Sequence, residues 1–158
     1  MPEKKYYLTK EGVIKIEKEL QRLKKEKQAL LNGTGPRSFR FGEIEAEYFA
    51  FREDLDRVEA KIAELENILE NYELIKIPPK KEQDKVHLGA KVLVELDGAV
   101  DEFKIVGTVE ADPANNKISD QSPIGRALLG KRVGEEVEVK TPMVNHICRI
   151  LKIKYESD

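Results

Sequence analysis

A stripe of apolar residues between positions 48 and 72 constrains the fold more than any other feature of this sequence. Its members are separated alternately by three and four positions: Tyr48, Phe51, Leu55, Val58, Ile62, Leu65, Leu69 and Tyr72. This spacing is typical of a coiled-coil seam, because it places every member on one face of an α-helix. A helix over about residues 43–73 would be roughly 45 Å long, and it needs a partner to cover the stripe.

A second stripe, upstream of the first, supplies that partner. It begins after Leu8 and comprises Val13, Ile16, Leu20, Leu23 and Leu30, with Lys27 at the missing step. Residues 32–36, "NGTGP", end the pattern, because glycine favours helix C-termini and proline cannot continue a helix. Two helices joined by a single loop are expected to pack antiparallel as a coiled-coil hairpin.

The hydrophobic period changes from helical to alternating after residues 75–85, "IKIPPKKEQDK", whose two prolines break the helix. Four later segments alternate apolar with polar residues, as strands with one buried face do. These segments are residues 91–96, 102–109, 135–141 and 147–155. A short helix is expected over residues 122–131, since Pro123 fits a first turn and Gly130 fits a helix end.

These patterns predict an α+β chain with two domains. Residues 1–76 are expected to form the helical hairpin domain and residues 77–85 a linker. Residues 86–158 are expected to form an antiparallel β-sheet domain with one short helix. The two hydrophobic periods are unlike each other, so we expect each domain to have a core of its own.

Composition narrows the classes of protein that fit. Charged residues make up 37% of the chain but the net charge is only -2, without the strong basic excess of a protein that grips nucleic acid by itself. Cys148 is the single cysteine, so no intrachain disulfide can form. The first residues lack the apolar run of a signal peptide, and no stretch approaches the length of a membrane span. We therefore expect a cytoplasmic monomer.

The hairpin loop is followed by an acidic cluster in the stretch "GEIEAEY", which contains Glu43, Glu45 and Glu47. If this stretch is helical, Glu43 and Glu47 share a face and Glu45 lies roughly 200° around the helix from Glu43. If it is extended through Ala46, all three fall on one side. Either arrangement offers carboxylates to magnesium, which takes its remaining ligands from water or a partner. Alternatively, the glutamates only favour the positive end of the helix dipole.

Three arginines surround the acidic cluster: Arg37, Arg40 and Arg52. They could attract a phosphate backbone, or they could only balance the glutamates. His87 and His146 have no cysteine or histidine at metal-ligand spacing, so structural or surface roles are expected for both.

The order of these parts, with four sequence motifs, resembles the bacterial Gre-type transcript-cleavage elongation factors over nearly the whole chain. The motifs are "LTKEG" at residues 8–12, "AEY" at 46–48, "FKIVG" at 103–107 and "ISDQSPIGRALLGKRVGEEVEVKTP" at 118–142. The last motif matches the family pattern "ISxxSPxxRALLGKxxGDxVxVxTP" almost without interruption. The resemblance implies an FKBP-like fold for the C-terminal domain.

The resemblance also implies a function. Gre-type factors dock on the rim of the secondary channel of RNA polymerase and insert the hairpin tip. Acidic residues there help to hold a second magnesium in the polymerase's own active site, which promotes hydrolysis of backtracked RNA. The implied partners are RNA polymerase and the backtracked RNA 3′ end. The implied cofactor is magnesium shared with the polymerase, with none bound tightly by the free protein, and the chain is not an enzyme alone.

By the same resemblance, docking is assigned to the loop and short helix after residue 121. The residues concerned are Ser122, Pro123, Ile124, Arg126 and Ala127. RNA contact is predicted for Arg37, Arg40 and Arg52 from their position around the acidic cluster, and not from the resemblance. The apolar members of the docking set could also cover the sheet, and both roles can hold because different faces of the helix would serve them.

The tip differs from the family pattern, which reads approximately "GDLKENAEY" and is two residues longer. A gapped alignment places Glu43 and Glu45 at the acidic positions, so these are the predicted metal ligands and Glu47 is the substitute. An ungapped alignment places Phe41 and Ile44 there. A second hypothesis is therefore a Gre-like polymerase-binding inhibitor that occupies the channel without stimulating cleavage.

A third hypothesis, an FKBP-like prolyl isomerase or chaperone, comes from the C-terminal half. Such an activity requires an apolar pocket lined by aromatic side chains. This half of the chain offers only Phe103 and Tyr155 and contains no tryptophan, so it ranks third.

Overall fold

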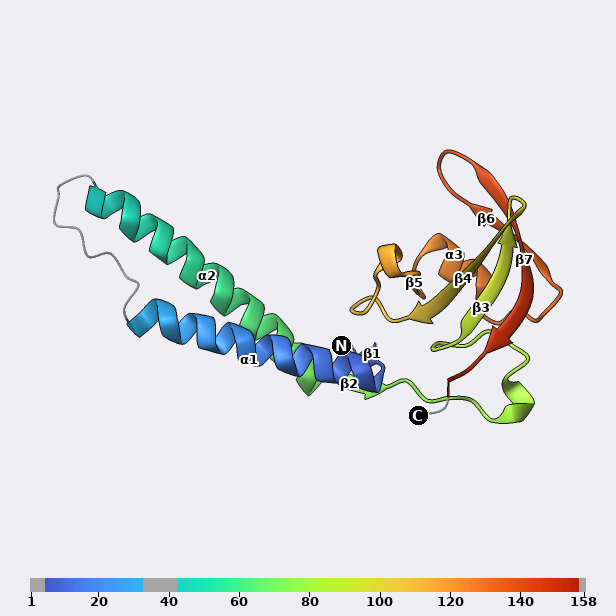
Figure 1. The fold of residues 1–158 in the computed structure, drawn as a ribbon, viewed down its shortest axis with the longest axis horizontal. Coiled ribbons are helices and arrows are strands. Elements are labelled where there is room, and N and C mark those ends of the chain that lie inside the picture. The colour runs from blue at the N-terminus through green and yellow to red at the C-terminus, as the bar shows by residue number, and fades with distance from the viewer. Residues whose placement is uncertain (1–4, 33–42, 157–158) are drawn as a thin grey trace. The chain divides into compact units, whose positions relative to one another are not determined.

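The structure is a computed structural model that describes residues 5–32 and 43–156, with side chains from residue 46 onward in the second range (Figure 1). Contacts divide the chain into two compact units. The helical unit lies within Glu11–Asn71, and the sheet unit combines residues 5–10 with residues 72–156.

The helical unit contains the two predicted helices, α1 (Lys10–Asn32) and α2 (Glu43–Glu70). The stripe of α1 is buried at Val13, Ile16, Leu20 and Leu23, and that of α2 is buried at Leu55, Val58, Ile62 and Leu65. In the last turn of α2, Ile68 is buried in place of the predicted Leu69, which is only partly buried. Ion pairs join the helices, from Lys24 to Glu66 and from Lys27 to Glu59, each at 3.5 Å. Because the partner number falls as the α1 number rises, the helices run antiparallel, as predicted.

The predicted seam is not buried along its full length. Tyr48 is 52% exposed and its neighbour Phe49 is 64% exposed, so the buried part of α2 starts at Leu55. At the other end, Tyr72 follows the helix and belongs to a strand. The coiled-coil spacing therefore predicted the helix correctly but overestimated how far the other helix covers it.

The sheet unit is built on a five-stranded sheet with the order β5-β4-β3-β7-β6 (Figure 1). The strands are β3 (Lys91–Leu96), β4 (Ala99–Val106), β5 (Lys117–Ser119), β6 (Glu136–Lys140) and β7 (Asn145–Lys154). The short helix α3 (Pro123–Leu128) and the sheet share a core. Its fully buried members include Val92, Val94, Ile105, Leu128, Cys148 and Ile150.

This sheet differs from the prediction in the direction of one strand and in the start of another. β5 pairs with β4 in parallel, and its three residues are too few to give a recognisable alternation. β4 begins at Ala99, earlier than predicted, because Asp97 and Gly98 form a tight turn after β3 with φ values of 50° and 84°. Two successive residues with positive φ suit a two-residue hairpin connection.

A further two-stranded parallel sheet pairs β1 (Tyr6–Leu8) with β2 (Tyr72–Leu74). Thr9, which follows β1, is held in the sheet unit by Glu110, whose carboxylate accepts hydrogen bonds from Thr9 N at 2.7 Å and Thr9 Oγ1 at 2.6 Å. Gly107 permits this approach, since a Cβ there would lie 2.5 Å from the carbonyl oxygen of Tyr7. The compact units thus differ from the predicted ranges 1–76 and 86–158: β1, β2 and the predicted linker belong with the sheet.

Candidate functional site

The acidic cluster lies at the first turn of α2, which begins at Glu43. Helical backbone places positions 43 and 47 on one face and position 45 roughly 200° away from position 43. Of the three glutamates, the structure describes only the side chain of Glu47, which is exposed. The helix therefore favours Glu43 with Glu47 as a pair over Glu43 with Glu45, while the metal role of all three stays a prediction.

The chemistry of this donor set fits magnesium. Carboxylate oxygens are hard ligands, and one or two of them leave coordination positions for water and for the oxygens of a partner or substrate. Among the side chains that the structure describes, no three histidine, cysteine, aspartate or glutamate residues gather as a metal site.

Of the three arginines predicted to contact RNA, the structure describes only Arg52. Arg37 and Arg40 are outside the described residues. Arg52 forms an ion pair with Asp56, one turn further along α2, at 3.6 Å, and both side chains are more than half exposed. An exposed pair of this kind is weakly held, so the guanidinium can exchange Asp56 for a phosphate. The RNA role of Arg52 stays a prediction.

Ser122, the first residue of the predicted docking surface, shapes the loop before α3. It is the N-cap of the helix: its hydroxyl accepts a hydrogen bond from Gly125 N at 3.0 Å and donates one to Ser119 O at 2.7 Å. Gly125 is required here because a Cβ would lie 2.0 Å from the same carbonyl oxygen. The loop is thus closed tightly against the helix by groups that point inward.

The groups that point outward form a compact polar surface. Pro123 and Arg126 are exposed, and the guanidinium of Arg126 donates a hydrogen bond to the amide oxygen of Gln121 at 3.3 Å. The amide of Gln121 lies 3.4 Å from the carboxylate of Asp120. The sequence did not predict a role for Asp120 and Gln121, because they occupy variable positions of the matching motif and so carry no signal of their own.

The apolar members of the predicted docking set have a second role. Ile124 and Ala127 are partly buried and pack against the core of the sheet unit. Both interpretations offered by the sequence therefore apply to α3: one face covers the sheet, and Pro123 and Arg126 remain on the surface.

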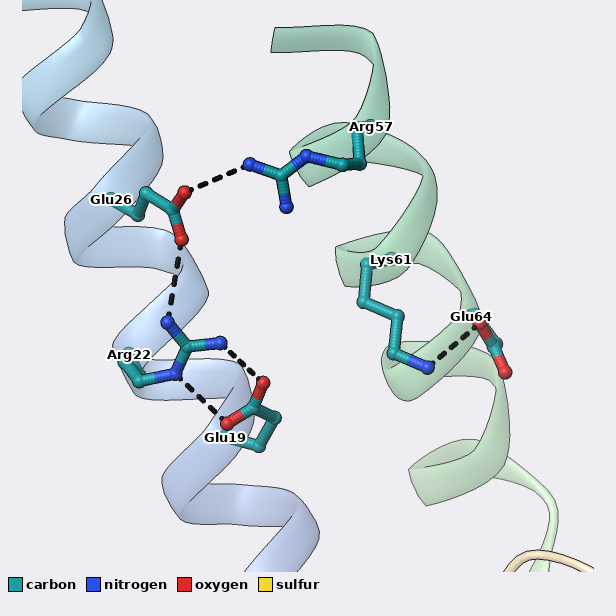
Figure 2. A network of polar contacts seen from close by, with 6 residues as sticks. All are labelled: Glu19, Arg22, Glu26, Arg57, Lys61 and Glu64. Carbon is teal, nitrogen blue, oxygen red and sulfur yellow. Dashed lines mark hydrogen bonds and ion pairs between the residues drawn. The ribbon is translucent and has the colours of Figure 1, made fainter. Parts of the chain in front are cut away.

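The shaft of the hairpin carries a network of exposed ion pairs (Figure 2). Arg22 contacts Glu19 at 2.6 Å and Glu26 at 3.5 Å, and Glu26 is also reached across the hairpin by Arg57 at 3.1 Å. Hydrogen bonding from Arg22 lowers the pKa of Glu19 and raises that of Arg22 itself. Exposed pairs contribute little singly, but this network ties α1 to α2 beside the buried seam.

The two aromatic residues of the isomerase hypothesis serve the packing of the sheet unit. Phe103 and Tyr155 pack against the core. The Tyr155 hydroxyl donates a hydrogen bond to Lys85 O at 2.5 Å and accepts one from His87 N at 2.8 Å. Both rings therefore have structural partners, which lowers the rank of this hypothesis further.

Comparison with known proteins places both halves of the chain. Residues 6–74 match the family model described as transcription elongation factor, N-terminal, and residues 80–155 match the model described as transcription elongation factor, GreA/GreB, C-term. Transcription elongation factor GreA of Clostridium acetobutylicum is 43% identical over 157 residues, covering 96% of this chain and 98% of that protein. GreA of Geobacillus kaustophilus is 41% identical over 156 residues, with the same coverage of 96% and 98%.

A solved structure matches this chain over a similar share of its length. The crystal structure of the GreA factor homolog 1 (Gfh1) protein of Thermus thermophilus is 28% identical, covers 96% of this chain and 99% of its own, and has a TM-score of 0.42. Within the part of the chain that the structure describes, no helix combines the length and apolarity needed to cross a membrane.

Proposed function

This chain belongs to the GreA/GreB family of transcription elongation factors, and from that premise we propose that it binds RNA polymerase and stimulates cleavage of backtracked RNA. Members of this family act on the polymerase and are not independent catalysts. The protein would therefore work in the cytoplasm, where it supplies groups to an active site that belongs to another molecule.

The observation that carries the proposal is the acidic first turn of a long helix. α2 has 28 residues, which corresponds to about 42 Å at about 1.5 Å per residue. A rod of this length can enter a channel that would exclude a globular domain. Glu43 at the start of this helix and Glu47 one turn later then bring negative charge to the far end of the channel, with Glu45 on another face of the helix.

Magnesium supplies the chemistry when it is held between the polymerase and this tip, because a second metal ion can generate a nucleophilic water and stabilise charge on the phosphate. The contribution of this chain is to position carboxylate oxygens on a stiff helix. Glu43 would bind the ion from the start of α2, and Glu47 would bind it from the next turn. Glu45, which the gapped alignment places at the second acidic position, would replace Glu47 if the first turn unwinds in the complex.

Docking is proposed for the surface around α3. Ser122 and Gly125 hold the loop in shape, while Gln121 and Arg126 offer polar groups and Pro123 an exposed apolar ring. The guanidinium of Arg126 has its donors in a fixed fork, which suits a carboxylate on the rim of the polymerase.

The second candidate is an inhibitor that occupies the channel without stimulating cleavage. The observation that favours it is the tip sequence "GEIEAEY", which is shorter than the family pattern. In this case the same docking surface and the same rod would place a tip in the channel that does not complete the metal site.

One experiment separates the two candidates. Purified full-length protein is added with magnesium to RNA polymerase stalled in backtracked complexes, and the labelled RNA is followed over time. Shortened RNA that appears faster than in a reaction without the factor is the expected result. Slower elongation with no shortened RNA would contradict the proposal and support the inhibitor.

A further inference from the structure

Four lysines lie directly opposite one another on four neighbouring strands of the sheet unit. Lys117 on β5 is opposite Lys104 on β4, Lys104 is opposite Lys91 on β3, and Lys91 is opposite Lys154 on β7. These strands are adjacent in the sheet (Figure 1). Residues opposite each other on paired strands point to the same face. The four side chains therefore form one line, here called the lysine row.

The lysine row lies on the face of the sheet opposite the core. Successive side chains on a strand point to opposite faces, and the neighbours of the lysines point inward. Val92, Ile105 and Ile118 belong to the buried core. A fifth lysine, Lys152, is opposite Leu93 and lies beside the row, where it lines a shallow hollow together with Lys91 and Lys154.

Such an arrangement is unfavourable for folding. Like charges directly opposite each other in a sheet destabilise the pairing. Neighbouring strands are about 4.8 Å apart, so the four positions are spread over about 14 Å. The lysines of the row do not stabilise one another, so their alignment points to a negatively charged ligand.

A carboxylate of the chain itself already contacts an inner member of the row, Lys91. Glu156 forms an ion pair with Lys91. The hydrogen bond from Lys91, and then the charges of Lys91 and Lys104, lower the pKa of Glu156. Glu102 also lines the hollow. Five lysines against two glutamates leave the surface positive, although the whole chain has a net charge of -2.

We propose that the lysine row binds the phosphate backbone of a single-stranded RNA. A straight line of point charges suits a linear polyanion better than one isolated phosphate group. Among the described residues that form the row and line the hollow, none is an aromatic on which a base could stack, so binding would not depend on sequence. A single row reaches one backbone, whereas a duplex presents two. This contact would be independent of polymerase and of the tip, and it goes beyond the proposed function.

The test is fluorescence anisotropy with a labelled single-stranded RNA of mixed sequence and the full-length protein at several salt concentrations. The triple variant K104Q/K117Q/K154Q is expected to bind at least fivefold more weakly than the wild type. Its plot of log affinity against log salt should be shallower by about 2, since each lost contact to a single strand removes about 0.7 from the slope. The control K15Q/K18Q/K25Q removes the same charge from exposed positions on α1.

A second variant has the opposite expected effect and so does not depend on weakened folding. Glu156→Gln removes the carboxylate that competes for Lys91, and the RNA affinity should rise, whereas Glu53→Gln on α2 changes the net charge equally and should leave it unchanged. Equal affinities for the lysine-row triple variant and its control would overturn the proposal. So would tighter binding of duplex DNA or of a polyglutamate peptide than of RNA.

Discussion

At the scale of single residues, the loop before α3 separates groups that hold its shape from groups that face outward. Ser122 Oγ acts inward by accepting a hydrogen bond from Gly125 N at 3.0 Å, and Gly125 leaves room for the Ser119 carbonyl, from which a Cβ would be only 2.0 Å away. Gln121 and Arg126 act outward through a hydrogen bond on the surface. Residues of one motif thus fall into two classes with different expected mutant behaviour.

Ser122→Ala should lower the free energy of unfolding by about 1 kcal/mol, because it removes a side-chain cap from α3. Arg126→Ala should leave this free energy nearly unchanged and weaken binding to RNA polymerase. Chemical denaturation and a polymerase pull-down measure the two quantities, with Thr108→Ala as an exposed control. An Arg126→Ala protein that binds polymerase as well as the wild type would remove Arg126 from the docking surface.

Tyr155 gives a prediction that depends on pH. Burial raises the pKa of its hydroxyl above the ordinary value of 10.0. Because the pKa is raised in the folded state, the contribution of the protonated Tyr155 hydroxyl to the free energy of unfolding is fully present below pH 10. That contribution is lost as the pH rises through the pKa that Tyr155 has in the folded protein. The loss of folding free energy in this alkaline range should therefore be smaller in Tyr155→Phe than in the wild type.

The same substitution should be costly at neutral pH. It leaves Lys85 O and His87 N without the Tyr155 hydroxyl, for an expected loss of about 1–3 kcal/mol. Chemical denaturation at pH 7 and over the alkaline range measures both effects, with Tyr7→Phe as the exposed control. Identical alkaline profiles for the wild type and Tyr155→Phe would show that another group governs the dependence.

At the scale of elements, the hairpin is stabilised by its seam more than by its ion pairs. Leu23 is 2% exposed and Leu31, on the same helix, is 53% exposed. Leu23→Ala should therefore cost about 2–5 kcal/mol, while Leu31→Ala should cost much less. Denaturation followed by the helical circular dichroism signal measures both. Equal costs would mean that the seam does not hold α1 in the hairpin.

The elements that the sequence predicted well are those with long periodic patterns. α1, α2 and β3 follow the predicted ranges closely, because many residues repeat the same spacing. β1, β2 and β5 have three residues each and depend on partners far away in the chain, so their local pattern carries too little information. The exposed start of the α2 seam, at Tyr48, was also beyond reach, because spacing identifies a face but not what covers it.

The candidate sites were predictable to different degrees for the same reason. The position of Glu43 at the start of a helix follows from the local pattern. The close packing of α3 against the loop before it does not follow from the local pattern. The carbonyl of Ser119 lies so near Gly125 that no side chain fits there, and residue spacing does not reveal such a distance. The lysine row is further still from prediction, because three separate strand registers must be known before the four charges line up.

At the scale of the whole molecule, the two compact units have separate tasks. The helical unit carries the acidic turn on a rod whose seam is apolar and whose outer surface is charged. The sheet unit carries the proposed docking surface and the lysine row, and it also holds the first strand of the chain through Glu110. The central claim is that this rod delivers carboxylates to a catalytic centre in RNA polymerase.

The most direct test of that claim is RNA cleavage in backtracked complexes with Glu43 and Glu47 both changed to glutamine. The control E17Q/E53Q removes the same charge from exposed positions on the shaft, and Glu45→Gln reports on the other face of the first turn. The account predicts that E43Q/E47Q loses at least tenfold in cleavage rate but still competes with the wild type for polymerase, while the control cleaves normally. Cleavage by E43Q/E47Q at the wild-type rate would contradict it.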